Sequence, residues 1–275
     1  MNVKVDLHLH SNWSDGSIGI PELIRLAKNL ELKVISITDH DTMAGQYEAI
    51  EEGKKQGMWI IPGVEISAYN PATGRKAHIL GFNVKDPEGL NQSCRPFLEA
   101  RHQKNLESVN RIIDAGYPIN INDIHKYTAL DGIVYRQHIM HAMVDRGYAT
   151  SIYGDLYNKF FGKFGLAKVK ATYMEAEEAV RLIIDCGGLA VLAHPFQYDS
   201  MDMVPRLKKI GLAGIEYRHH TQTFVQEKAV LEASLRYNLF LAGGSDFHGF
   251  YSEKCLQPGC TDTVLPKSHP LINNL

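Results

Sequence analysis

The chain has 275 residues, of which 44% are hydrophobic, and its formal net charge at pH 7 is -2. This size and composition suffice for a full hydrophobic core, in one barrel-sized domain or in two smaller ones, and they exclude intrinsic disorder. A chain so close to neutral is not attracted as a whole to nucleic acid or to anionic membranes, so any recognition of phosphate has to be local. We therefore expect neither long duplex nucleic acid nor a membrane among its partners.

The four cysteines show no Cys-x-x-Cys spacing, which argues against a zinc ribbon and against a disulfide framework. The N-terminus carries Lys4 and Asp6 where a signal peptide would need an apolar stretch. No apolar run has the length required to span a bilayer. These features predict a soluble, cytoplasmic protein with reduced thiols.

The first part of the chain alternates strand-like and helix-like segments. Pro21 near the start of one helical pattern and Gly57 at the end of the next are typical of helix limits. Strands are predicted at 3–10, 34–38, 59–66 and 77–82, and helices at 17–30 and 43–56.

The sequence pattern changes between residues 88 and 170, where predicted helices follow one another without intervening strands. We expect helices at 95–115, 122–129 and 134–146. The aromatic side chains between Tyr153 and Phe164 are interpreted mainly as the core of a small subdomain, with stacking on a nucleobase as the alternative. The chain is thus predicted to contain a helical insertion, 88–170, within a domain formed by 1–87 and 171–275.

The alternation of helices and strands returns after the insertion. Helices are predicted at 174–186, 204–210 and 226–237, and strands at 189–193, 213–217 and 239–243. The last segment, 251–275, contains several proline and glycine residues and is predicted to be irregular. Seven candidate strands alternating with helices predict an α/β fold with a parallel sheet covered by helices.

The first strand ends in a pair of histidines. Because side chains alternate along a strand, Asp6, His8 and His10 point to one face and the apolar residues between them point to the other. Neutral imidazole is the commonest side-chain metal ligand, so this pair indicates two positions of a metal site.

Residues of the types that bind metals also follow nearly all of the remaining predicted strands. They include Asp39-His40 after the second strand, Glu65 after the third, His194 after the fifth, Glu216 after the sixth and Asp246-Phe247-His248 after the seventh, while His78 lies near the start of the fourth. A parallel barrel gathers the ends of all its strands at one face, whereas an open sheet concentrates chemistry at one switch point. The pattern therefore favours a barrel with a single site.

These motifs, taken in order, resemble the PHP (polymerase and histidinol phosphatase) family of metal-dependent phosphoesterases. The resemblance rests on Asp6-Leu7-His8-Leu9-His10-Ser11, Ser14-Asp15-Gly16, Thr38-Asp39-His40, Gly63-Val64-Glu65-Ile66-Ser67, His78-Ile79-Leu80-Gly81, Ala193-His194-Pro195 and Gly244-Ser245-Asp246-Phe247-His248-Gly249. It implies a distorted (β/α)7 barrel and a site for three divalent metal ions.

The resemblance also implies a distribution of ligands. The first metal would be bound by His8, His10 and Asp246, the second by His78 and His194 with Glu65 as a bridge to the first, and the third by Asp15, His40 and His248. Mixed imidazole and carboxylate ligands without thiolates suit Mn, Fe or Zn. Asp6 and Asp39 are expected to orient ligating imidazoles.

Clustered divalent metals activate water and neutralise charge on phosphate oxygens, so we expect a metal-bound hydroxide as the nucleophile. No serine or cysteine nucleophile constellation is visible, which argues against a covalent intermediate. Catalytic roles are expected for Asp39, His219 and His220, with a histidine as the candidate general acid.

Contacts to substrate phosphate are predicted for Arg136, His138 and Arg218. Arg136 and His138 resemble the Arg-x-His segment of the nucleotide-hydrolysing branch of the family, and an arginine fork fits a phosphate bidentately. The second arginine of that segment is replaced here by His141, which leaves the binding mode open.

The predicted function is hydrolysis of a phosphate monoester in a small nucleotide, of the 3',5'-bisphosphonucleoside type, or at the 5' end of a short oligoribonucleotide. Histidinol phosphate phosphatase is the first alternative, and a noncatalytic metal-binding accessory domain is the second. The sequence leaves the oligomeric state and the physiological metal open.

Overall fold

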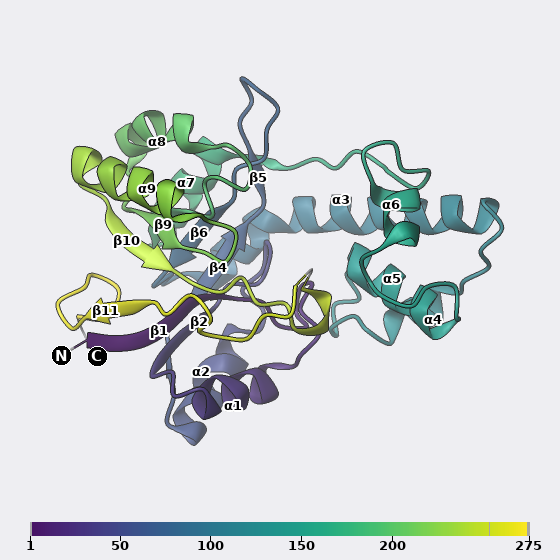
Figure 1. The fold of residues 1–275 in the computed structure, drawn as a ribbon, viewed down its shortest axis with the longest axis horizontal. Coiled ribbons are helices and arrows are strands. Elements are labelled where there is room, and N and C mark those ends of the chain that lie inside the picture. The colour runs from purple at the N-terminus through teal and green to yellow at the C-terminus, as the bar shows by residue number, and fades with distance from the viewer. Residues whose placement is uncertain (1, 253, 274–275) are drawn as a thin grey trace.

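The computed structural model describes residues 2–252 and 254–273, and it contains two main sheets (Figure 1). The first sheet has the order β11-β1-β2-β3 and consists of β1 (Asn2–Leu9), β2 (Val34–Ile37), β3 (Trp59–Ile60) and β11 (Val264–Pro266). The second has the order β10-β9-β8-β6-β4 and consists of β4 (Gly63–Ile66), β6 (Ile79–Phe82), β8 (Leu189–Leu192), β9 (Gly214–Arg218) and β10 (Phe240–Gly243).

The two sheets meet at two seams near the C-terminal ends of their strands. A bridge between Leu9 and Phe247 joins β1 to the segment after β10, and a bridge between His40 and Glu65 joins the segment after β2 to β4. Strands of both sheets share one apolar cluster, to which Leu7 of β1, Phe82 of β6 and Val191 of β8 contribute. The predicted α/β fold is confirmed, although its sheets are not joined into one continuous hydrogen-bonded ladder.

One predicted strand is interrupted. The segment 59–66 forms β3, which pairs with β2, and β4, which pairs with β6. Pro62 lies between them, and because proline has no backbone N–H it cannot donate to a ladder there.

The expectation of a wholly parallel sheet is wrong at β6. This strand runs antiparallel to both β4 and β8, whereas β8 to β9 and β9 to β10 are parallel. The start of β6 therefore lies at the edge where its neighbours end. His78, which precedes the strand instead of following it, consequently reaches the same face of the molecule as the other histidines.

Helices cover the sheets in the described part of the chain (Figure 1). They are α1 (Ile20–Asn29), α2 (Gln46–Gln56), α7 (Ala176–Asp185), α8 (Val204–Ile210) and α9 (Phe224–Tyr237). Leu23, Ile24 and Ala27 of α1 are buried because the 3.6-residue period places them on one face. Close to α7, the two-stranded pair of β5 (Ala68–Tyr69) and β7 (Met174–Glu175) completes this half of the molecule.

Four further helices lie to one side of the sheets (Figure 1): α3 (Pro87–Asp114), α4 (Ile121–His125), α5 (Arg136–Asp145) and α6 (Asp155–Phe161). They form a hydrophobic cluster of their own, which includes Ile112, Ile139 and Phe160. Helix α3 begins eight residues earlier than predicted, because Asp86 accepts a hydrogen bond from Gly89 N (2.9 Å) and caps the helix before Pro87. The limits of a separate insertion domain stay a prediction.

The C-terminal segment is not irregular throughout. Residues 264–266 form β11, which pairs antiparallel with the start of β1 in the register Asn2–Pro266. A three-residue strand is too short to show a period in the sequence, and Pro266 is tolerated because β11 is at the edge of its sheet. Short 3-10 turns occur at Met201–Met203 and Gly249–Tyr251. Among the described residues, no helix is both long enough and apolar enough to cross a membrane.

Candidate metal centre

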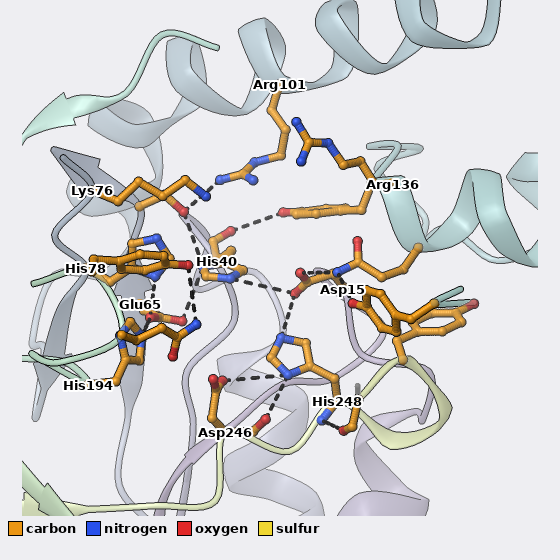
Figure 2. Close-up of a pocket in the computed structure, with 18 of the residues that line it drawn as sticks. Asp15, His40, Glu65, Lys76, His78, Arg101, Arg136, His194, Asp246 and His248 are labelled. Atoms are coloured by element: carbon orange, nitrogen blue, oxygen red, sulfur yellow. Dashed lines mark hydrogen bonds and ion pairs between the residues drawn. The ribbon is translucent and has the colours of Figure 1, made fainter. Parts of the chain in front are cut away.

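All nine predicted ligands converge at the edge where the strands end, and Figure 2 shows most of them around one cavity. Each reaches this point from a strand end or from the residues beside it. The nine are His8, His10, Asp15, His40, Glu65, His78, His194, Asp246 and His248.

The first predicted group is compact. The Nε2 atoms of His8 and His10 lie 3.1 and 3.2 Å from Glu65 Oε2, and 3.3 and 3.2 Å from Asp246 Oδ1. The ligand atoms of these four residues all lie within 4.8 Å of one another. Two imidazoles and two carboxylates thus surround one point, as a metal-binding site requires.

The second oxygen of Glu65 faces the second predicted group. His78 Nδ1 lies 2.7 Å and His194 Nε2 lies 2.8 Å from Glu65 Oε1. Because its two oxygens face different histidine pairs, Glu65 has the geometry of a carboxylate that bridges two metals.

The third predicted group is looser. Asp15 Oδ1 lies 3.3 Å from His248 Nε2 and 3.9 Å from His40 Nε2. His10 belongs to this group as well, with its Nδ1 3.8 Å from Asp15 Oδ1. His40 also approaches Glu65 Oε2 through Nδ1, at 3.3 Å, so the three groups form one continuous cluster.

The residues present fit divalent metals. Several buried ligand atoms form no hydrogen bond with the described part of the chain, namely His8 Nε2, both ring nitrogens of His10, Asp15 Oδ1 and His194 Nδ1. Buried polar atoms normally have partners, so this set of orphans indicates that another group satisfies them. His194 and Asp246 also adopt positive φ angles of 21° and 53°, a costly conformation that is found at functional sites.

The electrostatics of the cluster agree with cation binding. Burial alone would raise the pKa of Glu65, but the histidines around it hold that pKa well below its usual range. The pKa of Asp246 is lowered in the same way. For His8, burial acts against the charged form, yet the surrounding carboxylates raise its pKa well above the ordinary value. The carboxylates are therefore ionised and demand positive charge at this point.

Glu216, which the sequence analysis noted after the sixth strand without giving it a role, is a buried carboxylate behind the first group. Glu216 Oε1 is 3.0 Å from His8 Nδ1, and Glu216 Oε2 accepts a hydrogen bond from the backbone N of His194 (2.6 Å). A carboxylate that binds one ring nitrogen leaves the other free for a metal and fixes the ring orientation. The sequence feature that could have indicated this role is the position of Glu216, a charged residue within the largely apolar strand β9.

The orienting role predicted for Asp6 and Asp39 is corrected accordingly. Asp6 accepts hydrogen bonds from Ser245 and from the backbone N of Gly259, so it holds loops rather than an imidazole ring. Asp39 accepts from Ser11 and Ser14. Since both of its oxygens are used in holding the loop after β1 and it does not line the cavity, the geometry speaks against a catalytic role for Asp39.

The wall opposite the metal cluster is basic. Figure 2 shows Lys76, Arg101 and Arg136 across the cavity from Asp246 and His248. Lys104 also lines this cavity, which has a volume of about 270 Å³. Among these four cations, Arg101 has a carboxylate partner, Asp41, at 2.5 Å, and no described residue provides one for the other three.

We call Lys76, Arg101, Lys104 and Arg136 the cationic wall. Three of its members were not predicted from the sequence. They come from the segment before β6 and from α3, where nothing in the local pattern separates them from ordinary surface charges.

The predicted phosphate contacts have different outcomes. Arg136 lies in the cavity wall, where its guanidinium is 5.2 Å from the ring of Phe161. His138 is fully buried and its Nδ1 accepts a hydrogen bond from Tyr135 N, so it caps α5 and does not line the cavity. Arg218 pairs with Glu227 at 3.0 Å outside the cavity lining. The structure therefore corrects the placement of His138 and Arg218.

The two candidate proton donors differ in access. His219 is buried, with Nε2 3.2 Å from Asp246 Oδ2 and Nδ1 2.8 Å from Thr221 Oγ1. His220 lines the cavity and binds the carbonyl of Ser245 through Nδ1 (3.0 Å). Burial lowers the pKa of His220 to about 4.

Tyrosines complete the cavity. Tyr153 and Tyr157 belong to the segment interpreted as a subdomain core, but they line the cavity, while Phe160 and Phe161 of the same segment are buried in the core. The interpretation as core is thus correct for Phe160 and Phe161 and wrong for Phe164, which is 89% exposed, while Tyr157 both packs against this core and lines the cavity.

Comparison with known proteins agrees with this geometry. Residues 6–189 match the PHP domain family. The chain is 38% identical over 245 residues to the phosphoribosyl 1,2-cyclic phosphate 1,2-diphosphodiesterase of Eggerthella lenta, covering 89% of this chain and 94% of that protein. It is 28% identical to the 3',5'-nucleoside bisphosphate phosphatase of Chromobacterium violaceum, covering 99% of this chain and 96% of that protein.

A solved structure supports the relationship. The crystal structure of a protein from Bifidobacterium adolescentis, described as a metal-dependent phosphoesterase, superposes with a TM-score of 0.83 and 27% identity, covering 92% of this chain and 90% of that one. The family match, these relatives and the converging ligand set agree. The chain belongs to the PHP domain family of metal-dependent phosphoesterases.

Proposed function

We propose that the chain hydrolyses one phosphate ester of a ribose-containing substrate that carries a second phosphate. A nucleoside 3',5'-bisphosphate or the 5' end of a short oligoribonucleotide is the preferred substrate. The observation that carries this proposal is the pairing of two unlike walls across one cavity. The metal cluster lies on one side and the cationic wall on the other, so two anionic groups of one ligand can be held at once.

The nine converging residues are the proposed ligands of divalent metals, and Mn, Fe or Zn suits their donor set. When bound, such ions supply Lewis-acid charge and lower the pKa of a coordinated water. Three sites are proposed because the nine predicted ligands fall into three neighbouring groups, with Glu65 between the first two.

The chain's own residues then position the substrate. Arg136 offers a planar guanidinium with an unpaired, buried Nε, which suits a phosphate that is not cleaved. His220 is the better placed of the two histidines for proton transfer, because it lines the cavity while both ring nitrogens of His219 are occupied. Glu216 holds the His8 ring in place and keeps its Nε2 directed at the cluster.

Histidinol phosphate is a poorer fit to the cavity. It carries one phosphate and an ammonium group, and a wall of basic side chains disfavours a cationic ligand. A noncatalytic accessory role is not supported either, because each of the nine predicted metal-ligand positions carries a histidine, aspartate or glutamate. The resemblance to a phosphoribosyl cyclic phosphate hydrolase favours a base-free ribose carrying two phosphate groups as the second candidate substrate.

The test is a comparison of substrates with the Mn-loaded enzyme. The substrates are adenosine 3',5'-bisphosphate, a 5'-phosphorylated dinucleotide, phosphoribosyl 1,2-cyclic phosphate, AMP and histidinol phosphate. Phosphate release is measured for the monoesters, and cleavage of the dinucleotide is followed by chromatography because hydrolysis of its phosphodiester frees a mononucleotide and no inorganic phosphate. The cyclic ester is followed by chromatography because its ring opens before phosphate leaves. We expect the largest kcat/KM among the first three. A preference for AMP or histidinol phosphate, both of which carry one phosphate, contradicts the proposal.

A further inference from the structure

Lys104 is an unusual member of the cationic wall. It lies on α3 with 6% of its surface exposed, and its ammonium group forms no hydrogen bond or ion pair with any described residue. A buried lysine without a partner is costly, because the charged form loses its hydration and receives nothing in return. A buried, unpartnered lysine that lines a cavity is therefore a candidate for binding an anionic ligand, which would supply the missing partner.

The charges that face Lys104 are mostly of its own sign. Arg101 precedes it by one turn of α3, Arg136 faces it from α5, and Lys76 faces it from the segment before β6. On its outer side, Lys104 also borders a groove that contains Glu107 and Lys170, and the Glu107 carboxylate lies 2.5 Å from Arg111.

We propose that Lys104 selects substrates with a second, uncleaved phosphate and takes up one proton from solvent as that phosphate binds. This inference rests on the proposed function and names the residue that reads the second phosphate. It concerns binding, not the bond that is cleaved. The proton forms a new N–H bond at Nζ, and the resulting ammonium group pairs with the phosphate.

The direction of the pH effect follows from the surroundings. Burial, followed by the neighbouring cations, lowers the pKa of Lys104 to about 6 in the free protein. Above that pH the side chain is neutral, so it must be protonated to meet an anion. A bound phosphate dianion favours the ammonium form and raises this pKa. Binding therefore weakens by up to about tenfold per pH unit above pH 6, until the pKa of the bound state is reached.

The experiment measures KM and kcat of the Mn-loaded enzyme between pH 6.5 and 8.5 with adenosine 3',5'-bisphosphate and with AMP. Lys104→Arg keeps the charge at every pH, because guanidinium is not deprotonated in proteins. We expect KM of the wild type for the bisphosphate to rise roughly tenfold or more across this range relative to Lys104→Arg. Lys104→Met is expected to raise that KM at pH 6.5 by roughly 10- to 100-fold, with kcat and the KM for AMP changed less than about threefold.

Two controls separate this role from a structural one. Lys126→Met removes an exposed lysine of α4's C-cap and should leave every parameter unchanged. The Tm of Lys104→Met should equal or exceed that of the wild type, because a buried polar amine without a hydrogen-bond partner is replaced by an apolar side chain.

The outcomes can be told apart. Parallel pH profiles for the wild type and Lys104→Arg, or an equal loss for AMP and the bisphosphate in Lys104→Met, overturn the role of Lys104 while leaving the proposed function in place. A wild-type enzyme that hydrolyses none of adenosine 3',5'-bisphosphate, the 5'-phosphorylated dinucleotide and phosphoribosyl 1,2-cyclic phosphate overturns the proposed function, and the inference fails with it.

Discussion

The two walls of the cavity differ in where their residues come from along the chain. The metal cluster is built from short motifs at the ends of strands, such as His8-Leu9-His10 and Asp246-Phe247-His248. The cationic wall is built from single residues of three separate segments, among them Lys76 and Arg136.

The difference matters for function. Ligand positions must be fixed to within a fraction of an ångström, and the buried ends of strands provide rigid attachment. Substrate selection tolerates more variation, and here it is assigned to helices α3 and α5, which lie beside the sheets. One would therefore expect damage to the first wall to abolish the reaction and damage to the second to change the choice of substrate.

Asp246→Asn tests the metal wall most directly. The carboxylate approaches His8, His10 and His219, so losing its charge should lower kcat by about 10³-fold, or about 4 kcal/mol in activation free energy. Phosphate release and bound metal per chain are measured together. An active variant with full metal content would show that Asp246 is not a ligand.

Glu216→Gln tests the support behind the same wall. Glutamine has one acceptor oxygen, whereas both oxygens of Glu216 are in use, so either His8 or the backbone of His194 loses its partner. Metal affinity should fall up to about 100-fold, as measured by titration with Mn. Glu227→Gln is the matched control, because this glutamate pairs with Arg218 away from the cavity. Equal affinities in the two variants would argue against an orienting role.

Arg136→Met tests the cationic wall. We expect KM for adenosine 3',5'-bisphosphate to rise about 30-fold, corresponding to about 2 kcal/mol, with kcat nearly unchanged. Arg146→Met provides the control, because Arg146 follows the other end of α5 and pairs with Asp123 at the surface. A fall in kcat without a change in KM would place Arg136 with the reacting groups instead.

Arg218→Met should have the smallest effect. The structure directs this side chain to Glu227 rather than into the cavity, so kcat/KM is expected to change less than about twofold. Steady-state kinetics with the bisphosphate decide the point. A large loss would restore the sequence-based prediction that Arg218 contacts phosphate.

Many elements of the fold were predictable from local patterns. Helix α1 was found because its apolar residues recur with the helical period, and in the structure capping by Thr223 fixes the start of α9. The features that were missed include the antiparallel course of β6 and the pairing of β11 with β1. Strand direction leaves no trace in a run of four apolar residues, because alternation is the same in both directions.

The sequence by itself determined the chemistry of the site. Metal ligands are few in type, and closely spaced motifs such as His8-x-His10 bring their ligands together through strand geometry alone. Only the tertiary structure decided which carboxylate supports them and which cations face them. Glu216, Lys76 and Lys104 are ordinary charged residues along the chain, and they become a support and a wall because the fold brings them to one cavity from segments that are distant in sequence. The energy of a charge depends on its surroundings, and these are set by the fold as a whole.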